Sequence, residues 1–378
     1  MRFGIDFRPA LFGGAGIGRC TREICRVLPG LLHPGEEAVL FGVAFKKPEP
    51  TLLQEDEFKA SPNVRIVRGR FPNRILNLLG RMGLTGVENF TGKLDLFLYT
   101  DFIYPPLKST PSCMMLYDLL FMREESGFHS VAFCRSLKRR VGAALARARG
   151  VVVPSRSVRE DLERFFPDAR LPVRVIPMGG DHLPEAKVPD KGPRPSSGRY
   201  FLSVGTMEPR KNRLRILEAF EHVARDMPGI QLVVAGRTGW MDESFQERLE
   251  ASKLRGEVLL LKDPDDAYLC WLYRNALALV YPSLGEGFGI PVAEAMAQGC
   301  PVITSNLSSM PEVAGGAARL VDPLDVASIA ESIVYLANNK EVRDELIRDG
   351  TVRSSEFTWR STATQILDFM REIQNITS

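Results

Sequence analysis

Short apolar runs, rich in β-branched and aromatic residues, recur along the chain and are separated by segments whose apolar positions repeat at helical spacing. Runs of this length bounded by turn residues are typical of buried strands. The first half predicts strands at Arg2–Asp6, Ala38–Phe45, Asn63–Val67, Leu94–Tyr99, Ser112–Tyr117, Gly150–Pro154 and Val173–Pro177. The second half predicts strands at Tyr200–Val204, Gln231–Ala235, Val258–Leu261, Ala278–Tyr281 and Cys300–Thr304. Because strands alternate with helices, the sequence predicts an α/β fold with parallel sheets.

A stretch without apolar periodicity, residues 183–198, divides these two sets of strands and is rich in Pro, Lys, Ser and Gly. Such a composition is typical of a linker. A chain of 378 residues is also long enough for two cores. We therefore expect an N-terminal domain at 1–182, a linker at 183–198 and a C-terminal domain at 199–358. A last helix is predicted from Trp359 to about Asn375.

Composition narrows the class of protein. The net charge is only +3, and the six cysteines are scattered with no C-x-x-C pair. These features argue against a disulfide framework or a cysteine metal site and fit a reducing cytoplasm. No signal peptide or membrane-spanning run is evident, since the first residues lead directly into a strand pattern. The basic clusters lack interleaved aromatic residues, so nucleic acid is not an expected partner.

The segment 285–299 contains the most informative chemistry. Pro291 suits a first helical position and Gly299 suits a left-handed helix end, so we expect a glycine-rich loop running into a short helix. Free N–H groups at such a helix start favour a phosphate. Glu286 lies on the loop and Glu294 lies inside the helix. Because carboxylates only accept hydrogen bonds, the pair suits sugar or ribose hydroxyls. The ligand should therefore carry both phosphate and polyol groups.

A second charged element is the pair Arg210–Lys211, at the start of a predicted helix. It could be a solvated helix end, but cations there oppose the helix dipole unless an anion binds. The N-terminal glycines Gly14, Gly16 and Gly18 do not fit the G-x-G-x-x-G spacing of a dinucleotide site. A nicotinamide or flavin site is therefore not expected, and no P-loop pattern is present.

Glu286 and Glu294 match the E-x7-E motif of retaining glycosyltransferases of family 4, and the chain resembles that family over nearly its whole length. Further matching segments, in the same order as in the family, are Met1–Leu28, Val175–Asp181, Val204–Asn212 and Met310–Val313. The resemblance implies a GT-B fold of two Rossmann-like domains facing a cleft, with the last helix packing back on the N-terminal domain. It also implies retention of anomeric configuration, for which a front-face mechanism is usually proposed.

The resemblance implies roles for individual residues. Glu286 would lie at the donor sugar, Glu294 would hold the nucleotide ribose, and Arg210 and Lys211 would bind the diphosphate and stabilise its growing charge. Other donor-binding positions expected from it are Gly205, Gly236, Lys262, Gly287, Phe288, Gly289 and Ile290. An acceptor or phosphate loop is expected at Gly13, Gly14 and Gly16. No cofactor and no metal are expected, because the chain shows no Asp-x-Asp motif in a matching context.

One position departs from the family pattern. Many relatives carry His-Asp at the strand end where this chain has Tyr117-Asp118. Both residues are still expected at the catalytic site, although an unperturbed pKa near ~10 makes a tyrosine a poor base at neutral pH. His129 is the nearest histidine and could substitute from the following loop. His33, His129, His182 and His222 are each expected in loops or on the surface.

Overall similarity favours a hexosyltransferase that takes mannose from GDP-mannose, ahead of a UDP-hexose, and acts in polysaccharide or lipopolysaccharide assembly. The acceptor would be a glycan or a lipid-linked sugar. Two alternatives remain open: a non-catalytic protein that binds nucleotide sugars, and a synthase of a soluble glycoside.

Basic residues in the segments 65–81 and 135–149 lie beside apolar ones, with no acid between Arg135 and Arg149. A basic amphipathic helix can lie on an anionic membrane, so we expect a cytoplasmic protein with peripheral contact at the inner face of the cytoplasmic membrane.

Overall fold

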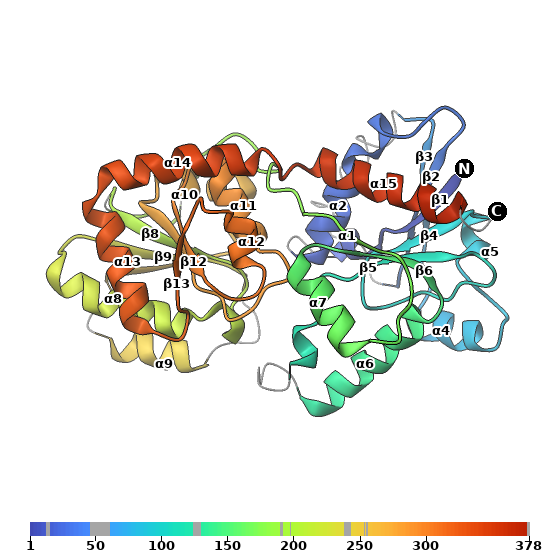
Figure 1. Cartoon of the computed structure of the whole chain (residues 1–378), viewed down its shortest axis with the longest axis horizontal. Coiled ribbons are helices and arrows are strands. Elements are labelled where there is room, and N and C mark those ends of the chain that lie inside the picture. The colour runs from blue at the N-terminus through green and yellow to red at the C-terminus, as the bar shows by residue number, and fades with distance from the viewer. Residues whose placement is uncertain are drawn as a thin grey trace. The chain divides into compact units, whose positions relative to one another are not determined.

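A computed structural model describes residues 1–12, 16–45, 61–123, 130–189, 192–196, 198–237, 243–252, 254 and 256–375. The chain divides into two compact units (Figure 1). The first unit comprises Met1–Met178 together with Trp359–Ser378, and the second comprises Gly179–Thr358. Each unit contains one parallel sheet with helices on both sides. The predicted α/β fold class with two parallel-sheet domains is therefore confirmed.

The first unit holds a parallel sheet of seven strands in the order β3-β2-β1-β4-β5-β6-β7. Its strands are β1 Arg2–Asp6, β2 Glu37–Val43, β3 Val64–Gly69, β4 Leu96–Tyr99, β5 Ser112–Met115, β6 Ala148–Val153 and β7 Val173–Val175. The chain winds from β1 first to one side and then to the other, which makes the sheet doubly wound. In such sheets ligands bind outside the carboxyl ends of the strands, where the strand order reverses.

The helices of the first unit include two short 3₁₀ turns. They are α1 Arg8–Phe12, α2 Ile17–Val27, η1 Leu28–Gly30, α4 Asn73–Arg81, α5 Glu88–Thr91, η3 Leu120–Met122, α6 Val131–Leu145, α7 Arg156–Phe165 and α15 Trp359–Asn375. The last of these packs against α2 and β6. Phe369 of α15 is buried over Gly150, where an added Cβ would lie 2.7 Å from the phenyl Cζ. The missing side chain at Gly150 thus makes room for the helix.

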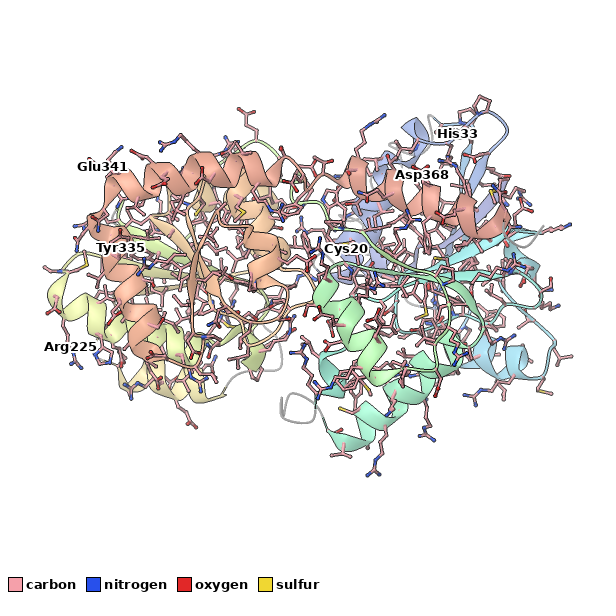
Figure 2. The ribbon with its side chains drawn as sticks, in the orientation of Figure 1. Cys20, His33, Arg225, Tyr335, Glu341 and Asp368 are labelled. Atoms are coloured by element: carbon pink, nitrogen blue, oxygen red, sulfur yellow. The ribbon has the colours of Figure 1, made fainter. Side chains whose placement is uncertain are left out.

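Side chains on the helices α15 and α2 lie either on the surface of the first unit or in its interior (Figure 2). Asp368 points outward from α15 and pairs with Arg371, whereas Cys20 of α2 is buried inside the unit. The strong amphipathicity of α15, which buries Ile366, Phe369 and Met370, explains why it covers the first sheet although it follows the second in sequence.

The second unit holds a parallel sheet of six strands in the order β10-β9-β8-β11-β12-β13. Its strands are β8 Tyr200–Val204, β9 Gln231–Gly236, β10 Val258–Lys262, β11 Ala278–Tyr281, β12 Val302–Ser305 and β13 Arg319–Val321. Its helices are η5 Pro209–Lys211, α8 Arg213–Asp226, α9 Glu243–Ala251, α10 Asp266–Asn275, α11 Ile290–Ala297, α12 Met310–Ala314, α13 Val326–Asn338 and α14 Lys340–Ser354. The strand order again reverses beside its first strand, β8.

The segment predicted as a linker is hydrogen-bonded to the second unit. Lys187 N donates to Ala267 O at 2.9 Å, and the Tyr268 hydroxyl donates to Pro193 O at 2.9 Å. Ser196 N donates to the side-chain oxygen of Gln231 at 2.8 Å. The second unit also starts earlier than expected, at Gly179. Residues 183–198 therefore join the units in sequence, but their described residues form part of the second unit.

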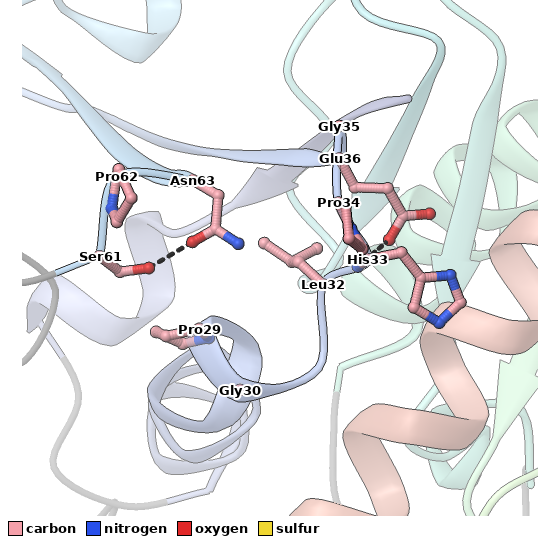
Figure 3. Close-up of a pocket in the computed structure, with 10 residues that line it drawn as sticks. All are labelled: Pro29, Gly30, Leu32, His33, Pro34, Gly35, Glu36, Ser61, Pro62 and Asn63. Carbon is pink, nitrogen blue, oxygen red and sulfur yellow. Dashed lines mark hydrogen bonds between the residues drawn. The ribbon is translucent and has the colours of Figure 1, made fainter.

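A surface pocket lies at the amino-terminal ends of β2 and β3 (Figure 3). It is lined by Pro29, Gly30, Leu32, His33, Pro34, Gly35, Glu36, Ser61, Pro62 and Asn63. Because ligands of doubly wound sheets bind at the opposite, carboxyl-terminal edge, this pocket is not a candidate for the predicted site. Within the described residues, no helix is both long and apolar enough to cross a membrane.

Candidate active site

The glycine-rich loop of the second unit follows β11 and leads into α11, as the sequence predicts. Gly289 is the N-cap of α11 and has φ of 99°, a left-handed conformation that favours glycine. A Cβ at Gly289 would lie 2.3 Å from Met310 Cε, so the site also excludes larger residues sterically. Gly299 closes the helix with φ of 68°. The prediction of a loop, a helix that begins beside Pro291, and a glycine after its end is confirmed.

Glu286 of this loop is buried and meets several polar groups. The Lys211 ammonium donates to its Oε1 at 2.6 Å, and Arg210 Nη1 donates to its Oε2 at 2.6 Å. The hydroxyls of Tyr281 and Ser283 lie 2.9 and 2.7 Å from Oε1. Two cations and two hydroxyls therefore fix this carboxylate in one orientation.

The contacts of Glu286 determine its charge. Burial by itself would raise its pKa, but the positive charges of Arg210 and Lys211 and the donated hydrogen bonds outweigh burial and lower the pKa to about 2. The pKa of Lys211 is lowered to about 8, first by burial and then by the neighbouring charge of Arg210, which the attraction of Glu286 offsets only in part. At neutral pH both groups are ionised, and Glu286 can only accept hydrogen bonds.

The basic pair lies on a tight turn after β8. Lys211 ends the short turn η5, and Asn212 follows in a left-handed conformation with φ of 60°. The Asn212 amide donates to Pro282 O at 3.0 Å and to Pro323 O at 2.6 Å, which ties the turn to the loops after β11 and β13. Leu284 N donates to Arg210 O at 2.9 Å. The backbone thus holds the basic pair next to Glu286.

Gly205 and Gly236 mark the ends of β8 and β9, and the two backbones touch. Gly236 has φ of 152°, and a Cβ there would lie 1.9 Å from Gly205 O. Gly205 itself has φ of 129°. Lys262 lies at the end of the neighbouring strand β10 and is exposed. All three predicted donor-binding positions are therefore at the carboxyl-terminal edge of the second sheet.

Glu294 lies within α11, where its side chain is buried. The Tyr273 hydroxyl of α10 donates to its Oε2 at 2.7 Å. His182 Nε2 lies 3.0 Å from its Oε1. His182 lies in a loop, as predicted, but its side chain has no exposed area, which excludes the surface position that the sequence allowed.

Several residues of this site were not found from the sequence. Ser308 and Ser309, after β12, donate to Glu286 O at 2.6 and 3.0 Å and so hold the loop backbone. Tyr281 and Ser283 contact the Glu286 carboxylate. For Tyr281 and Ser283, the sequence gave one indication, which was their position next to the glycine loop. The serines after β12 gave none, because their contact arises from the pairing of β11 with β12.

Other predicted site residues lie in the first unit. The Tyr117 hydroxyl lies 3.6 Å from Met115 Sδ, and burial, with smaller contributions from the neighbouring Cys20, raises its pKa well above its usual value. It is therefore a hydrogen-bonding group and not a base. Asp118 Oδ1 accepts from Leu120 N at 3.1 Å. Gly16 is the N-cap of α2 with φ of 59°, whereas Gly13, Gly14 and His129 lie outside the described residues.

The geometry joins Glu286, Arg210 and Lys211 in direct contact and places Glu294 on the helix that follows. In the part of the chain that the structure describes, no group of three or more His, Cys, Asp or Glu residues is arranged to hold a metal ion. Two doubly wound parallel sheets, the second of which carries an acidic loop-to-helix pair beside a basic turn, define a GT-B glycosyltransferase.

Comparison with known proteins gives the same class. The family model for glycosyl transferases group 1 matches residues 185–353. The chain is 28% identical over 375 residues to O-antigen chain mannosyltransferase B of Escherichia coli, covering 95% of this chain and 97% of that protein. It is 32% identical over 196 residues to phosphatidyl-myo-inositol mannosyltransferase of Mycobacterium leprae (strain TN), covering 51% of each.

Among solved structures, sucrose-phosphate synthase from Thermosynechococcus elongatus superimposes with a TM-score of 0.75 at 19% identity, covering 100% of both chains. This likeness establishes the shared fold. Residues 185–353 are similar to the glycosyl transferases group 1 family, and the chain is a hexosyltransferase of GT-B fold.

Proposed function

We propose that the enzyme transfers mannose from GDP-mannose to a growing polysaccharide, lipopolysaccharide or lipid-linked acceptor. The relatives reported above support mannose as the transferred sugar, because both are named mannosyltransferases, and the E. coli protein aligns along almost the whole chain. The names of the two relatives also support the acceptor class: one acts on an O-antigen chain and the other on a phosphatidyl-inositol.

The observation that carries the proposal is the contact of Glu286 with Arg210 and Lys211. In the transfer, the bond between the anomeric carbon and the diphosphate oxygen breaks, and a bond to the acceptor oxygen forms. The acceptor proton passes to the leaving diphosphate. Negative charge develops on that diphosphate, and a basic pair held by backbone contacts would stabilise it without reorganisation.

Glu286 has a complementary role in this proposal. Its lowered pKa keeps it ionised, so it would accept hydrogen bonds from the hydroxyls of the transferred sugar. Since Arg210 and Lys211 supply positive charge at the diphosphate, we propose that transfer needs no divalent metal. Activity should then persist in excess EDTA, and its loss with recovery on adding Mg²⁺ or Mn²⁺ would contradict this part.

The test is transfer of radiolabelled mannose from GDP-mannose to isolated lipid-linked oligosaccharide acceptors. UDP-glucose and UDP-N-acetylglucosamine serve as competing donors. The Glu286→Ala and Arg210→Ala variants should lose at least about a hundredfold in kcat/KM, as for loss of a transition-state contact. Glu331→Gln on α13, an exposed carboxylate, is the matched control and should retain activity.

Three outcomes contradict the proposal. Preferential transfer from a UDP-sugar would contradict GDP-mannose as the donor. Efficient transfer to a free sugar would contradict a polysaccharide or lipid-linked acceptor. Tight binding of GDP-mannose without transfer to any acceptor would favour the non-catalytic alternative.

We also propose that the first unit docks on an anionic membrane. On α4, Ile75 and Leu78 are 47% and 59% exposed, and Met82 just after it is 63% exposed. The exposed Arg74 and Arg81 flank them. Apolar side chains beside cations suit the interface between headgroups and acyl chains.

Helix α6 repeats this pattern. Val131 and Phe133 at its start are 65% and 44% exposed. Lys138, Arg139 and Arg140 are exposed, and none of the three has an ion pair within the described residues. The helix ends at Leu145, so the predicted continuation of the basic helix to Arg149 is wrong: Arg149 lies on β6 and donates to Gln374 at 3.1 Å.

Liposome flotation tests this docking with vesicles of phosphatidylcholine alone or with phosphatidylglycerol. Wild type should float only with the anionic lipid, and reversing Lys138, Arg139 and Arg140 to Glu should abolish flotation. Reversal of three exposed cations of the second unit, Arg225, Lys340 and Arg348, is the control and should have little effect. Equal behaviour of the two triple variants would contradict docking through α6.

A further inference from the structure

The segment from Gly179 to His182 opens the second unit and lies against α11. A Cβ at Gly180 would lie 2.7 Å from the carbonyl carbon of Ala293 and 2.8 Å from its Cβ. Gly180 N also donates to Phe357 O at 2.9 Å, which anchors the segment from the other side. Only glycine allows the backbone to approach the helix this closely. The residue after Ala293 on that helix is Glu294.

The close approach brings His182 to Glu294. The side chain of His182 has no exposed area, that of Glu294 is 6% exposed, and Nε2 lies 3.0 Å from Oε1. On the other carboxylate oxygen, Oε2, the fully buried Tyr273 donates at 2.7 Å. The two oxygens are thus contacted from two separate elements, the opening segment and α10. Tyr273 makes a hydrogen bond, whereas His182 Nε2 lies at ion-pair distance without hydrogen-bond geometry, so the carboxylate lies enclosed between the two side chains.

We propose that His182 is a positioning residue that, together with Tyr273, orients the Glu294 carboxylate toward the ribose hydroxyls of the donor nucleotide. This inference rests on the proposed function, in which Glu294 holds the ribose. A carboxylate already held in the binding orientation loses little conformational entropy when the diol binds. Without His182, only Tyr273 would contact the Glu294 carboxylate, which would then have more rotational freedom about its last torsion, and ribose recognition would weaken.

A buried histidine could instead serve only the packing of the opening segment. The two roles differ in what they do to ligand preference. A packing role affects the stability of the unit and weakens all nucleotides alike, whereas a positioning role acts through the ribose hydroxyls alone. The ratio of affinities for a ribonucleotide and for its analogue without those hydroxyls separates the roles.

The experiment is isothermal titration of GDP and 2′,3′-dideoxy-GDP into the full-length protein. Wild type should prefer GDP. In His182→Ala the affinity for GDP should fall roughly three- to tenfold while the affinity for the dideoxy analogue stays the same, as expected for loss of preorganisation in one side chain. Glu294→Ala should show the same pattern with a larger loss. His182→Gln retains an N–H donor and should recover part of the preference.

His222→Ala, which removes an exposed histidine of α8 in the same unit, is the matched control and should behave as wild type. In transfer assays His182→Ala should raise the KM for the donor and leave kcat unchanged, as for loss of a contact equally strong in ground and transition states. Thermal unfolding of each variant shows whether it is folded.

Two results would overturn the positioning role: an unchanged GDP preference in His182→Ala, or an equal loss for both nucleotides with a lower unfolding temperature. Failure of the proposed function looks different, because wild type would then bind neither GDP nor its dideoxy analogue.

Discussion

The ammonium of Lys211 offers the sharpest test of the electrostatics of the site. It is buried, 8% exposed, and paired with Glu286. Burial and the charge of Arg210 lower its pKa from its usual 10.5 to about 8. The group is therefore mostly protonated at pH 7 and mostly neutral at pH 9. We predict that nucleoside diphosphate binding follows this titration.

The size of the effect follows from the pKa. If only the protonated amine binds the diphosphate, the apparent Kd for GDP is multiplied by one plus the ratio of neutral to protonated Lys211. With a pKa of about 8, this factor is close to one at pH 7 and about ten at pH 9. The loss is roughly tenfold, equivalent to about 1.4 kcal/mol.

Glu286→Gln should move this response. Glu286 is the foremost of the groups that raise the pKa of Lys211, so its neutralisation lowers that pKa below about 8. The rise in Kd should then begin at a lower pH than in wild type. In Lys211→Met the response should be absent, and any residual change in Kd in that variant measures titration of the nucleotide itself.

The assay is calorimetric titration with GDP at several values of pH between 7 and 9, repeated in two buffers that differ in ionisation enthalpy. Binding to wild type above pH 8 should take up close to one proton per nucleotide, because the bound anion restores the charge of Lys211. A wild-type Kd that stays constant from pH 7 to 9, or a rise of equal size in Lys211→Met, would refute the reasoning.

Three further predictions concern stability. Gly236→Ala should lower the unfolding free energy of the second unit by about 3 kcal/mol or more, because the added Cβ would lie 1.9 Å from Gly205 O. Denaturant unfolding measures this loss, and a change below about 1 kcal/mol would contradict the close backbone contact. Phe369→Ala should cost the first unit about 3–5 kcal/mol, read as a lower thermal midpoint, and an unchanged midpoint would mean that α15 does not stabilise that unit. Arg371→Ala should lower the unfolding free energy by about 1 kcal/mol at pH 7, because the hydrogen bond from Arg371 lowers the pKa of Glu36. This contribution to stability is present above the pKa of the unfolded carboxyl and is lost as the pH falls through the lowered pKa of the folded state. An equal cost of the substitution at pH 7 and at pH 3 would contradict the ion pair.

Local features of the fold could be predicted because neighbouring residues determine them. The strands Arg2–Asp6, Tyr200–Val204 and Ala278–Tyr281 have the predicted bounds, since each is a short, mainly apolar segment next to polar or turn residues. The helix Trp359–Asn375 was also predicted with its bounds, from its amphipathic periodicity. The edge strand Arg319–Val321 was not predicted.

The residues that surround Glu286 and Glu294 were harder to predict from the sequence. The sequence identified Glu286 and the basic pair through the resemblance and the glycine loop, but it could not place Ser308 or His182. These residues reach the site through strand pairing and through the packing of Gly180 on α11, which bring together positions far apart in sequence. The local composition around His182 resembles that of any polar turn, so only the tertiary contact shows that the side chain is buried.

The same contacts suggest why the site should favour a sugar nucleotide over its diphosphate product. Arg210 also donates to the Glu208 carboxylate at 2.7 Å, so the cluster holds two acids and two bases and its formal charges cancel. A diphosphate that shares the hydrogen bonds of Arg210 and Lys211 would leave the buried Glu286 carboxylate with fewer donors, which is costly. A transferred sugar would replace the lost donors with its own hydroxyls, whereas a free nucleoside diphosphate cannot. Departure of the sugar would then return the cations to Glu286 and weaken the hold on the product.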